Sequence, residues 1–276
     1  MNDLAAVAPV VARLAAGGMG AVYTAVQESL SREVALKVIR PGLIDDGFRA
    51  RFEREARATS SLRDPHVVTV HDFGIDGELP FIVFEKLEGE DLAAALQARG
   101  RMPWRRGARV LRGIASALAA AHTAGVVHRD LKPSNVFLIA TAADPAFAKV
   151  LDFGIAKILD DDSAGVKTTT GIVLGTPGYV PPERMRGEPD DPRSDLYALG
   201  ALAWDMVAGR GPLVAPTQIL LSVKHMTERP PNLLTVADVP DDLALLVGEL
   251  LEKTPARRPQ SAAHVVARLA ALLSAA

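Results

Sequence analysis

The pattern of the chain changes once, from strand-forming to helix-forming segments, and this change limits the fold more than any other feature. Alternating and β-branched segments predict strands at residues 9–16, 21–27, 31–39, 67–73 and 80–85, interrupted by one helical segment at 48–62. Beyond Asp91, helices are expected at 92–99, 107–125, 195–207, 217–226, 241–251 and 261–275. Because strands and helices are segregated rather than alternating, we expect an α+β protein of two packed lobes.

Charge and cysteine content exclude several classes of function. The 276 residues carry 31 Lys and Arg against 33 Asp and Glu, so the chain lacks the basic surplus of nucleic-acid-binding proteins. The absence of cysteine excludes disulfides, thiolate metal sites and a cysteine nucleophile. No apolar stretch reaches the ~18 residues of a membrane span, and the opening segment has no positive n-region. We therefore expect a cytoplasmic location with no nucleic acid or membrane contact, and an anchor outside this segment stays open.

Two features of the strand-rich part point to a phosphate site. Gly17, Gly18 and Gly20 lie between the first two strands, where glycine lets backbone amides approach phosphate oxygens. A flexible hairpin would leave the same pattern. Lys37 lies near the end of an apolar strand, and a buried ammonium needs a partner, for which Glu55 on the following helix is the natural candidate. The alternative is a surface lysine that merely follows a strand.

A loop in the helical part gathers the groups that phosphoryl transfer needs. Residues 128–135 read HRDLKPSN and place the carboxylate of Asp130, the ammonium of Lys132 and the amide of Asn135 close together. Residues 151–154 read LDFG, in which the carboxylate of Asp152 lies between apolar residues and is followed by a hinge glycine. Carboxylate and amide oxygens are hard ligands that suit Mg²⁺.

These motifs occur in an order and spacing that resemble a known family. With VPPE at residues 180–183, Asp195 and Arg258, the chain resembles the bacterial branch of the eukaryotic-like serine/threonine protein kinases from about Ala8 to Ala275. The string GGMGAVY at residues 17–23 is typical of bacterial members. The resemblance implies one two-lobed catalytic domain over residues 1–276. Its parts would be an N-lobe with an antiparallel sheet and one helix (1–84), a hinge (85–90) and a larger, mainly α-helical C-lobe (91–276).

The resemblance also implies roles for individual residues. Asp130 would orient the substrate hydroxyl and accept its proton, while Lys132 and Lys37 would hold the phosphates. Asn135 and Asp152 would bind the metal. The residues expected to contact ATP are Leu14, Gly17, Gly18, Gly20, Val22, Ala35, Lys37, Glu55, Phe84, Glu85 and Leu87.

Further positions would serve the protein substrate and the scaffold. Thr176, in the string GTPGY at residues 175–179, would help to set the substrate hydroxyl. Asp195 would brace the catalytic loop, and Glu183 would pair with Arg258. Both of these roles are structural.

The activity implied by the resemblance is Mg-ATP-dependent (or Mn-ATP-dependent) transfer of the γ-phosphoryl group to Ser and Thr hydroxyls of protein substrates in bacterial signalling. Lys132 accompanies Ser/Thr specificity in this family, and the GTPGY string agrees with it. Two alternatives stay open: a nucleotide-binding pseudokinase scaffold and a small-molecule phosphotransferase with the same fold.

Activation by phosphorylation is a further implication. Arg129 precedes Asp130, as in kinases whose activation segment is ordered by a phosphate. Thr168 and Thr170 stand at the positions that bacterial relatives autophosphorylate, for which a homodimer acting in trans is a candidate arrangement. The alternative is a flexible, solvent-exposed Thr-rich loop.

Three positions depart from the family pattern. Ala15 replaces the first glycine of the loop and should stiffen the turn. Pro181 replaces the usual alanine at the substrate shelf, which bears on peptide preference. Thr59 stands one helical turn after Glu55, where an apolar residue is usual, so its hydroxyl is expected to weaken the packing that locks this helix.

Overall fold

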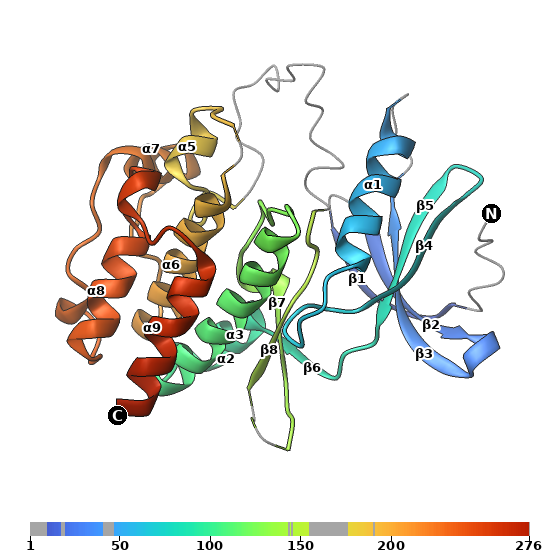
Figure 1. Cartoon of the computed structure of the whole chain (residues 1–276), viewed down its shortest axis with the longest axis horizontal. Helices are drawn as coiled ribbons and strands as arrows, with labels where there is room; N and C mark the ends of the chain where they lie inside the picture. Colours follow the sequence, from blue (N-terminus) through green and yellow to red (C-terminus); the bar gives the residue numbers. More distant parts are fainter. Residues whose placement is uncertain are drawn as a thin grey trace.

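An antiparallel sheet with one helix forms the N-terminal part of the computed structural model, which describes residues 10–17, 20–40, 47–142, 144, 146–154, 176–189 and 191–275 (Figure 1). The five strands lie in the order β1 (Val10–Gly17), β2 (Gly20–Gln27), β3 (Arg32–Ile39), β5 (Leu79–Glu85) and β4 (Val70–Asp76). Helix α1 (Phe48–Ser60) packs against β4, where the ring of Phe52 meets that of Phe73 edge-on at 6.2 Å. A 3₁₀ turn, η2 (Glu28–Leu30), joins β2 to β3.

Helices make up most of the C-terminal part, which Figure 1 shows on the other side of the molecule. The helices are α2 (Leu92–Arg99), α3 (Trp104–Thr123), α5 (Pro182–Met185), α6 (Pro192–Ala208), α7 (Gln218–Thr227), α8 (Asp241–Leu250) and α9 (Ala262–Ala275). Short 3₁₀ turns are η4 (Pro133–Asn135), η5 (Leu233–Thr235) and η6 (Pro255–Arg257). A small sheet of β6 (Gly89–Asp91), β7 (Val136–Ile139) and β8 (Phe147–Val150) completes this part. The predicted α+β, two-lobed fold class is confirmed.

The fourth strand differs from the prediction. The sequence predicts a strand over residues 67–73, whereas β4 begins at Val70. Val67 instead forms a parallel bridge with Val150, and the Val68 N–H donates to the Val150 carbonyl at 3.0 Å. These β-branched residues do adopt extended backbone, but they pair with the C-terminal part rather than with their own sheet, a partner that local pattern cannot reveal.

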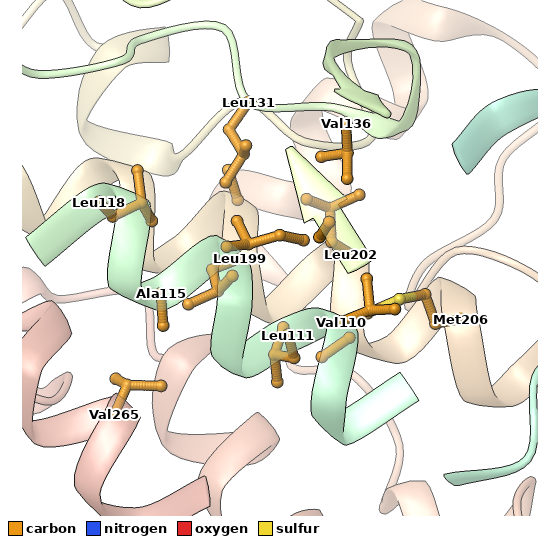
Figure 2. Packing of buried hydrophobic residues seen from close by; sticks show 14 of the residues in the cluster. Val110, Leu111, Ala115, Leu118, Leu131, Val136, Leu199, Leu202, Met206 and Val265 are labelled. Carbon is orange, nitrogen blue, oxygen red and sulfur yellow. The ribbon is translucent and has the colours of Figure 1, made fainter. Parts of the chain in front are cut away.

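One apolar cluster, built mainly on α3, α6, α8 and α9, supports the loop that follows α3. Figure 2 shows Leu131 and Val136 above Leu199 and Leu202 of α6, and all four side chains are buried. Burying a leucine stabilises a fold by about 1.5–3 kcal/mol. The core therefore holds the segment that carries Asp130, Lys132 and Asn135 at two points, within it at Leu131 and directly after it at Val136.

Within the part of the chain that the structure describes, none of the helices combines the length and the apolar content that a membrane crossing requires.

Candidate active site

The buried carboxylate of Asp195 holds the backbone of the loop at residues 128–135. Asp195 lies in the first turn of α6, which Asp191 caps by accepting the Arg193 N–H at 2.7 Å. Asp195 Oδ2 accepts the N–H of His128 at 2.8 Å, and Asp195 Oδ1 accepts the N–H of Arg129 at 2.9 Å. Asp195 therefore fixes the two peptide groups that precede Asp130.

His122, at the end of α3, is a second partner of Asp195, with Nε2 2.9 Å from Oδ2. Burial by itself would raise the pKa of the Asp195 carboxyl, but the hydrogen bond from His122 and the His128 peptide hold that pKa below its ordinary value. Neither the spacing of His122 nor its neighbours in sequence indicate this contact.

His128 connects the loop to the segment around Asp152. Its Nε2 lies 2.8 Å from the Leu151 carbonyl, which can only accept, so Nε2 carries the proton and Nδ1 accepts the Asp130 N–H at 3.3 Å. The ring also meets Phe153 edge-on at 4.8 Å. This fully buried histidine thus joins the two motifs that carry Asp130 and Asp152.

Asp130 is the point on which the loop's polar side chains converge. Its Oδ2 accepts Lys132 Nζ at 2.7 Å and Asn135 Nδ2 at 3.3 Å. Asn135 Nδ2 also donates to the Asp130 carbonyl at 2.8 Å. These bonds fix the orientation of the Asp130 carboxylate, and they leave the amide oxygen of Asn135 as the atom that a cation would meet.

Lys37 forms its ion pair with Asp152, where the sequence predicts Glu55 as the partner. Lys37 Nζ lies 2.7 Å from Asp152 Oδ2, and the lysine is 7% exposed. Glu55 is also buried, on α1, and accepts Arg54 Nε at 3.1 Å. Its Oε2 lies 3.5 Å from the position that a Cβ on Gly154 would occupy, so Glu55 does lie beside the segment that carries Asp152.

Thr59 bonds to this same segment. Its hydroxyl donates to the Phe153 carbonyl at 3.1 Å, and the residue is buried. We expected this hydroxyl to weaken the packing of α1. The structure instead shows a directional hydrogen bond from α1 to Phe153 in place of the usual apolar contact.

Backbone strain is concentrated at the same two motifs. Arg129 and Asp152 have φ angles of +70° and +61°. Side chains other than glycine seldom adopt this left-handed region, and it persists where surrounding contacts enforce it. The contacts of Asp195, His128 and Lys37 provide that enforcement.

Three of the apolar residues predicted to contact ATP lie together in one cluster. Ala35 pairs with Phe84 across β3 and β5. Both belong to one apolar cluster with Leu87 and Leu151, and Leu151 was not predicted. The position of Leu151 directly before Asp152 in the sequence is the signal that would have indicated its place beside the site.

The glycine-rich turn joins β1 and β2. Gly20 has a φ of +154°, and a Cβ there would lie 2.0 Å from the Val38 carbonyl oxygen, so the sheet itself requires glycine. Gly17 pairs with Gly20, Ala15 pairs with Val22, and Leu14 is an exposed residue at the irregularity between Arg13 and Ala15. Gly18 lies outside the described residues.

Residues 9–268 match the family described as protein kinase domain. The chain belongs to the protein kinase domain family.

Curated relatives of this kinase domain are serine/threonine-protein kinases. It is 42% identical over 270 residues to serine/threonine-protein kinase pkn3 of Myxococcus xanthus, covering 95% of this chain and 49% of pkn3. It is 42% identical over 266 residues to pkn2 of Myxococcus xanthus, covering 95% of this chain and 32% of pkn2. It is 38% identical over 254 residues to PknA of Mycobacterium tuberculosis, covering 90% of this chain and 57% of PknA. The chain thus spans between about a third and three fifths of these relatives.

Members of the protein kinase family use ATP and a divalent metal ion, and the donor set of this kinase domain fits such an ion. Asn135 and Asp152 offer an amide oxygen and a carboxylate, which are hard ligands. The Leu151 N–H donates to the Asn135 carbonyl at 2.9 Å, which places the two motifs next to each other.

Glu85, at the end of β5, carries an ion pair that the sequence did not indicate. Glu85 was predicted to contact ATP, and its side chain accepts the Thr69 N–H at 2.8 Å and Lys149 Nζ at 2.6 Å. Burial by itself would raise the pKa of Glu85, but Lys149 and the Thr69 N–H lower it below its ordinary value. Residues far apart in sequence meet here, so no local motif signals the contact.

The predicted substrate shelf, residues 176–181, directly precedes α5 in the chain and contacts α6. Thr176 is exposed, and its carbonyl accepts the Tyr179 N–H at 3.0 Å. Tyr179 OH donates to Asp205 Oδ2 on α6 at 2.6 Å, where burial raises the pKa of Asp205. Glu183 forms a bidentate pair with Arg258, at 2.6 and 2.7 Å.

The predicted phosphorylation sites Thr168 and Thr170 lie outside the described residues.

Proposed function

We propose that this chain transfers the γ-phosphoryl group of ATP to Ser and Thr hydroxyls of protein substrates. The observation that carries the proposal is the convergence of Lys132 and Asn135 on the carboxylate of Asp130, beside the Lys37–Asp152 pair. Phosphoryl transfer depends mainly on positioning and on charge stabilisation, and this arrangement supplies both.

Each charged group has a definite task in this proposal. Asp130, held by its hydrogen bonds, orients the acceptor hydroxyl and takes up its proton. Lys132 and Lys37 face the phosphate oxygens. Asn135 and Asp152 hold the divalent ion, with Mg²⁺ favoured over Mn²⁺ by its abundance and its hard oxygen ligands. When bound, the ion neutralises charge on the phosphates.

The remaining predicted residues shape the nucleotide site and the acceptor site. The apolar cluster of Ala35, Phe84 and Leu87 would receive adenine, with the Glu85 backbone beside it. Gly17, Gly18, Gly20, Leu14 and Val22 would cover the phosphates and the base. Glu55 would orient α1 against the Asp152 segment. Thr176 would meet the acceptor hydroxyl.

The test compares the purified protein with its Asp130→Asn variant. Each is incubated with γ-labelled ATP, MgCl₂ and myelin basic protein, and acid hydrolysis of the product identifies the labelled residue. We expect phosphoserine and phosphothreonine from the wild type, and a rate at least ~10²-fold lower from the variant, the scale on which loss of a general base acts.

A matched control is Asp72→Asn, which changes a carboxylate of β4 far in sequence from these motifs. Equal transfer by wild type and Asp130→Asn would contradict the proposal. ATP binding without transfer in either protein would instead support the nucleotide-binding scaffold. Repeating the assay with MnCl₂ ranks the two metals.

Autophosphorylation in trans is part of the proposal. We expect mass spectrometry to find phosphate on Thr168 or Thr170 in the wild type, and active protein to phosphorylate the Asp130→Asn variant at the same positions. A labelled wild type that leaves the variant unlabelled would contradict the trans reaction while leaving the kinase assignment intact.

A further inference from the structure

Helix α7 is attached to the C-terminal part through one buried side chain. Of its residues Gln218–Thr227, all of which the structure describes, His225 is the only buried one. Ile219 is 76% exposed and Leu220 is 47% exposed, so these two side chains do not anchor the helix, and Leu221 and Met226 are only partly buried. What holds His225 therefore contributes to the position of α7, since this is the one fully buried side chain of the helix.

A fully buried tyrosine of α6 holds this histidine. Tyr197 OH lies 2.8 Å from His225 Nδ1, and the two rings meet edge-on at 5.9 Å. Lys253 Nζ donates to the same hydroxyl at 3.0 Å. Lysine can only donate, so the hydroxyl accepts from Lys253 and has its own proton to give to Nδ1. His225 is then the neutral tautomer with its proton on Nε2.

His225 destabilises the fold in a way that an apolar residue at this position would not. Its Nε2 is buried and has no hydrogen-bond partner among the described residues. An unsatisfied buried polar group destabilises a fold, and its presence in a native structure calls for an explanation. Leucine or phenylalanine would fill the space without that penalty, so the feature that distinguishes histidine here is the directional bond to Tyr197.

The same tyrosine faces the residues that hold the shelf. The charged ends of Lys253 and Arg258 lie 5.2 and 5.0 Å from the centre of its ring. Arg258 forms the bidentate pair with Glu183, the first acidic residue of α5. Tyr197 thus contacts both His225 of α7 and the cation that fixes α5.

Helix α7 itself borders the shelf. Figure 1 shows α5 and α7 side by side, and the two helices are in contact. A Cβ on Gly178, within the predicted shelf, would lie 4.0 Å from Leu221 of α7. A displacement of α7 would therefore change one wall of the segment that receives the acceptor peptide.

We propose that His225 is a positioning residue for the acceptor substrate: its hydrogen bond to Tyr197 sets α7 against residues 176–181 and so determines the KM for the protein substrate. The inference rests on the proposed kinase function. It goes beyond that function because it assigns acceptor binding to a residue that touches neither nucleotide nor metal ligand.

The test uses steady-state kinetics with ATP and myelin basic protein. His225→Leu removes the bond, Tyr197→Phe removes it from the other side, and His225→Asn keeps an acceptor near the position of Nδ1. We expect His225→Leu and Tyr197→Phe to raise the KM for the acceptor roughly fivefold to tenfold, with the KM for ATP within about twofold of wild type, because only acceptor binding is lost. His225→Asn should restore most of the acceptor KM.

A matched control is Lys224→Ala, which removes a surface ion pair with Glu228 from the same helix and should leave both KM values unchanged. A parallel rise in both KM values, or an acceptor KM that stays at the wild-type level in His225→Leu and Tyr197→Phe, would overturn the proposal. So would a failure of His225→Asn to differ from His225→Leu.

Amide hydrogen exchange provides a second measurement that needs no turnover. In His225→Leu, residues 218–227 and 176–181 should exchange faster than in wild type, while residues 104–123 stay unchanged. Unchanged exchange at 176–181 would contradict the coupling. A wild type that transfers no phosphate while this exchange pattern holds would refute the kinase assignment and leave the positioning of α7 supported.

Discussion

The hydroxyl of Thr59 donates to the backbone carbonyl of Phe153 across 3.1 Å, which ties helix α1 to the segment that carries Asp152. Asp152 in turn forms the ion pair with Lys37 of β3. A single hydrogen bond on α1 thus helps to place the charged groups that face the phosphates in the proposed reaction.

Removing that hydroxyl should weaken the proposed metal site. Thr59→Val keeps the shape and deletes the donor, so we expect a loss of about 1–2 kcal/mol in unfolding free energy, as for other buried hydrogen bonds. We also expect a higher MgCl₂ concentration for half-maximal activity. Thr59→Ser keeps the donor and should behave like wild type. An unchanged Mg²⁺ requirement in Thr59→Val would show that the bond does not position Asp152.

The Lys149–Glu85 ion pair should appear as energetic coupling between these two residues. Lys149 and Glu85 are both largely buried, so Lys149→Met leaves an unpaired carboxylate and should reduce the unfolding free energy by about 1–3 kcal/mol. Glu85→Gln should reduce the unfolding free energy by less than Lys149→Met does. The double variant Lys149→Met/Glu85→Gln should lose less unfolding free energy than the two single variants lose together. Urea unfolding of the four proteins measures this cycle. Additive effects, within about 0.5 kcal/mol, would exclude an energetic link.

The Glu183–Arg258 pair should tolerate no change in geometry. Both side chains are almost fully buried, and Arg258→Lys keeps the charge but loses the planar fork that makes two bonds to Glu183. We expect a loss of about 3 kcal/mol in unfolding free energy and a strong fall in phosphate transfer. Lys224→Ala, at an exposed pair, should cost less than about 1 kcal/mol. Comparable losses in both variants would contradict the argument.

Stability should fall in mild acid because of His225. Burial, with a smaller contribution from Lys253, lowers the pKa of His225 from 6.5 to about 4 in the folded protein. Between these two pKa values the unfolded chain binds more protons, so the unfolding free energy falls as the pH drops from about 6.5 towards 4, by up to about 3 kcal/mol. Above pH ~6.5 the residue is neutral in both states and contributes no pH dependence.

Urea unfolding of wild type and His225→Asn at several pH values checks this effect. The difference between the two proteins isolates His225 from the other titrating groups. We expect the stability of the variant to depend less on pH than that of wild type between about pH 6.5 and 4. Parallel pH profiles would show that His225 is not held neutral by the fold.

Local pattern was sufficient to predict most of the architecture. Strand and helix periodicity located the five strands of the large sheet and most of the helices, and the α+β class followed from the order of the segments; the short strands β6, β7 and β8 and the helix α5 were not predicted. The family was predicted from short motifs, because their order and spacing can be read directly from the sequence.

Contacts between distant segments were not predictable in the same way. The bond of Val68 to Val150, the partner of Lys37 and the role of His122 each depend on how two parts of the fold meet. Thr59 illustrates this limit. The sequence shows a polar residue where an apolar one is usual, but only the three-dimensional structure shows that its hydroxyl donates to the Phe153 carbonyl.

The Glu183–Arg258 pair also has a consequence for how the protein folds during translation. Arg258 stands 75 positions after Glu183, so the ion pair that holds α5 cannot form until those further residues have been made. The strand-rich part emerges first, and domains fold from the N-terminus as they are made. A nascent chain could therefore form the sheet of β1 to β5 before this ion pair, and premature termination before Arg258 would leave Glu183 of α5 without its partner.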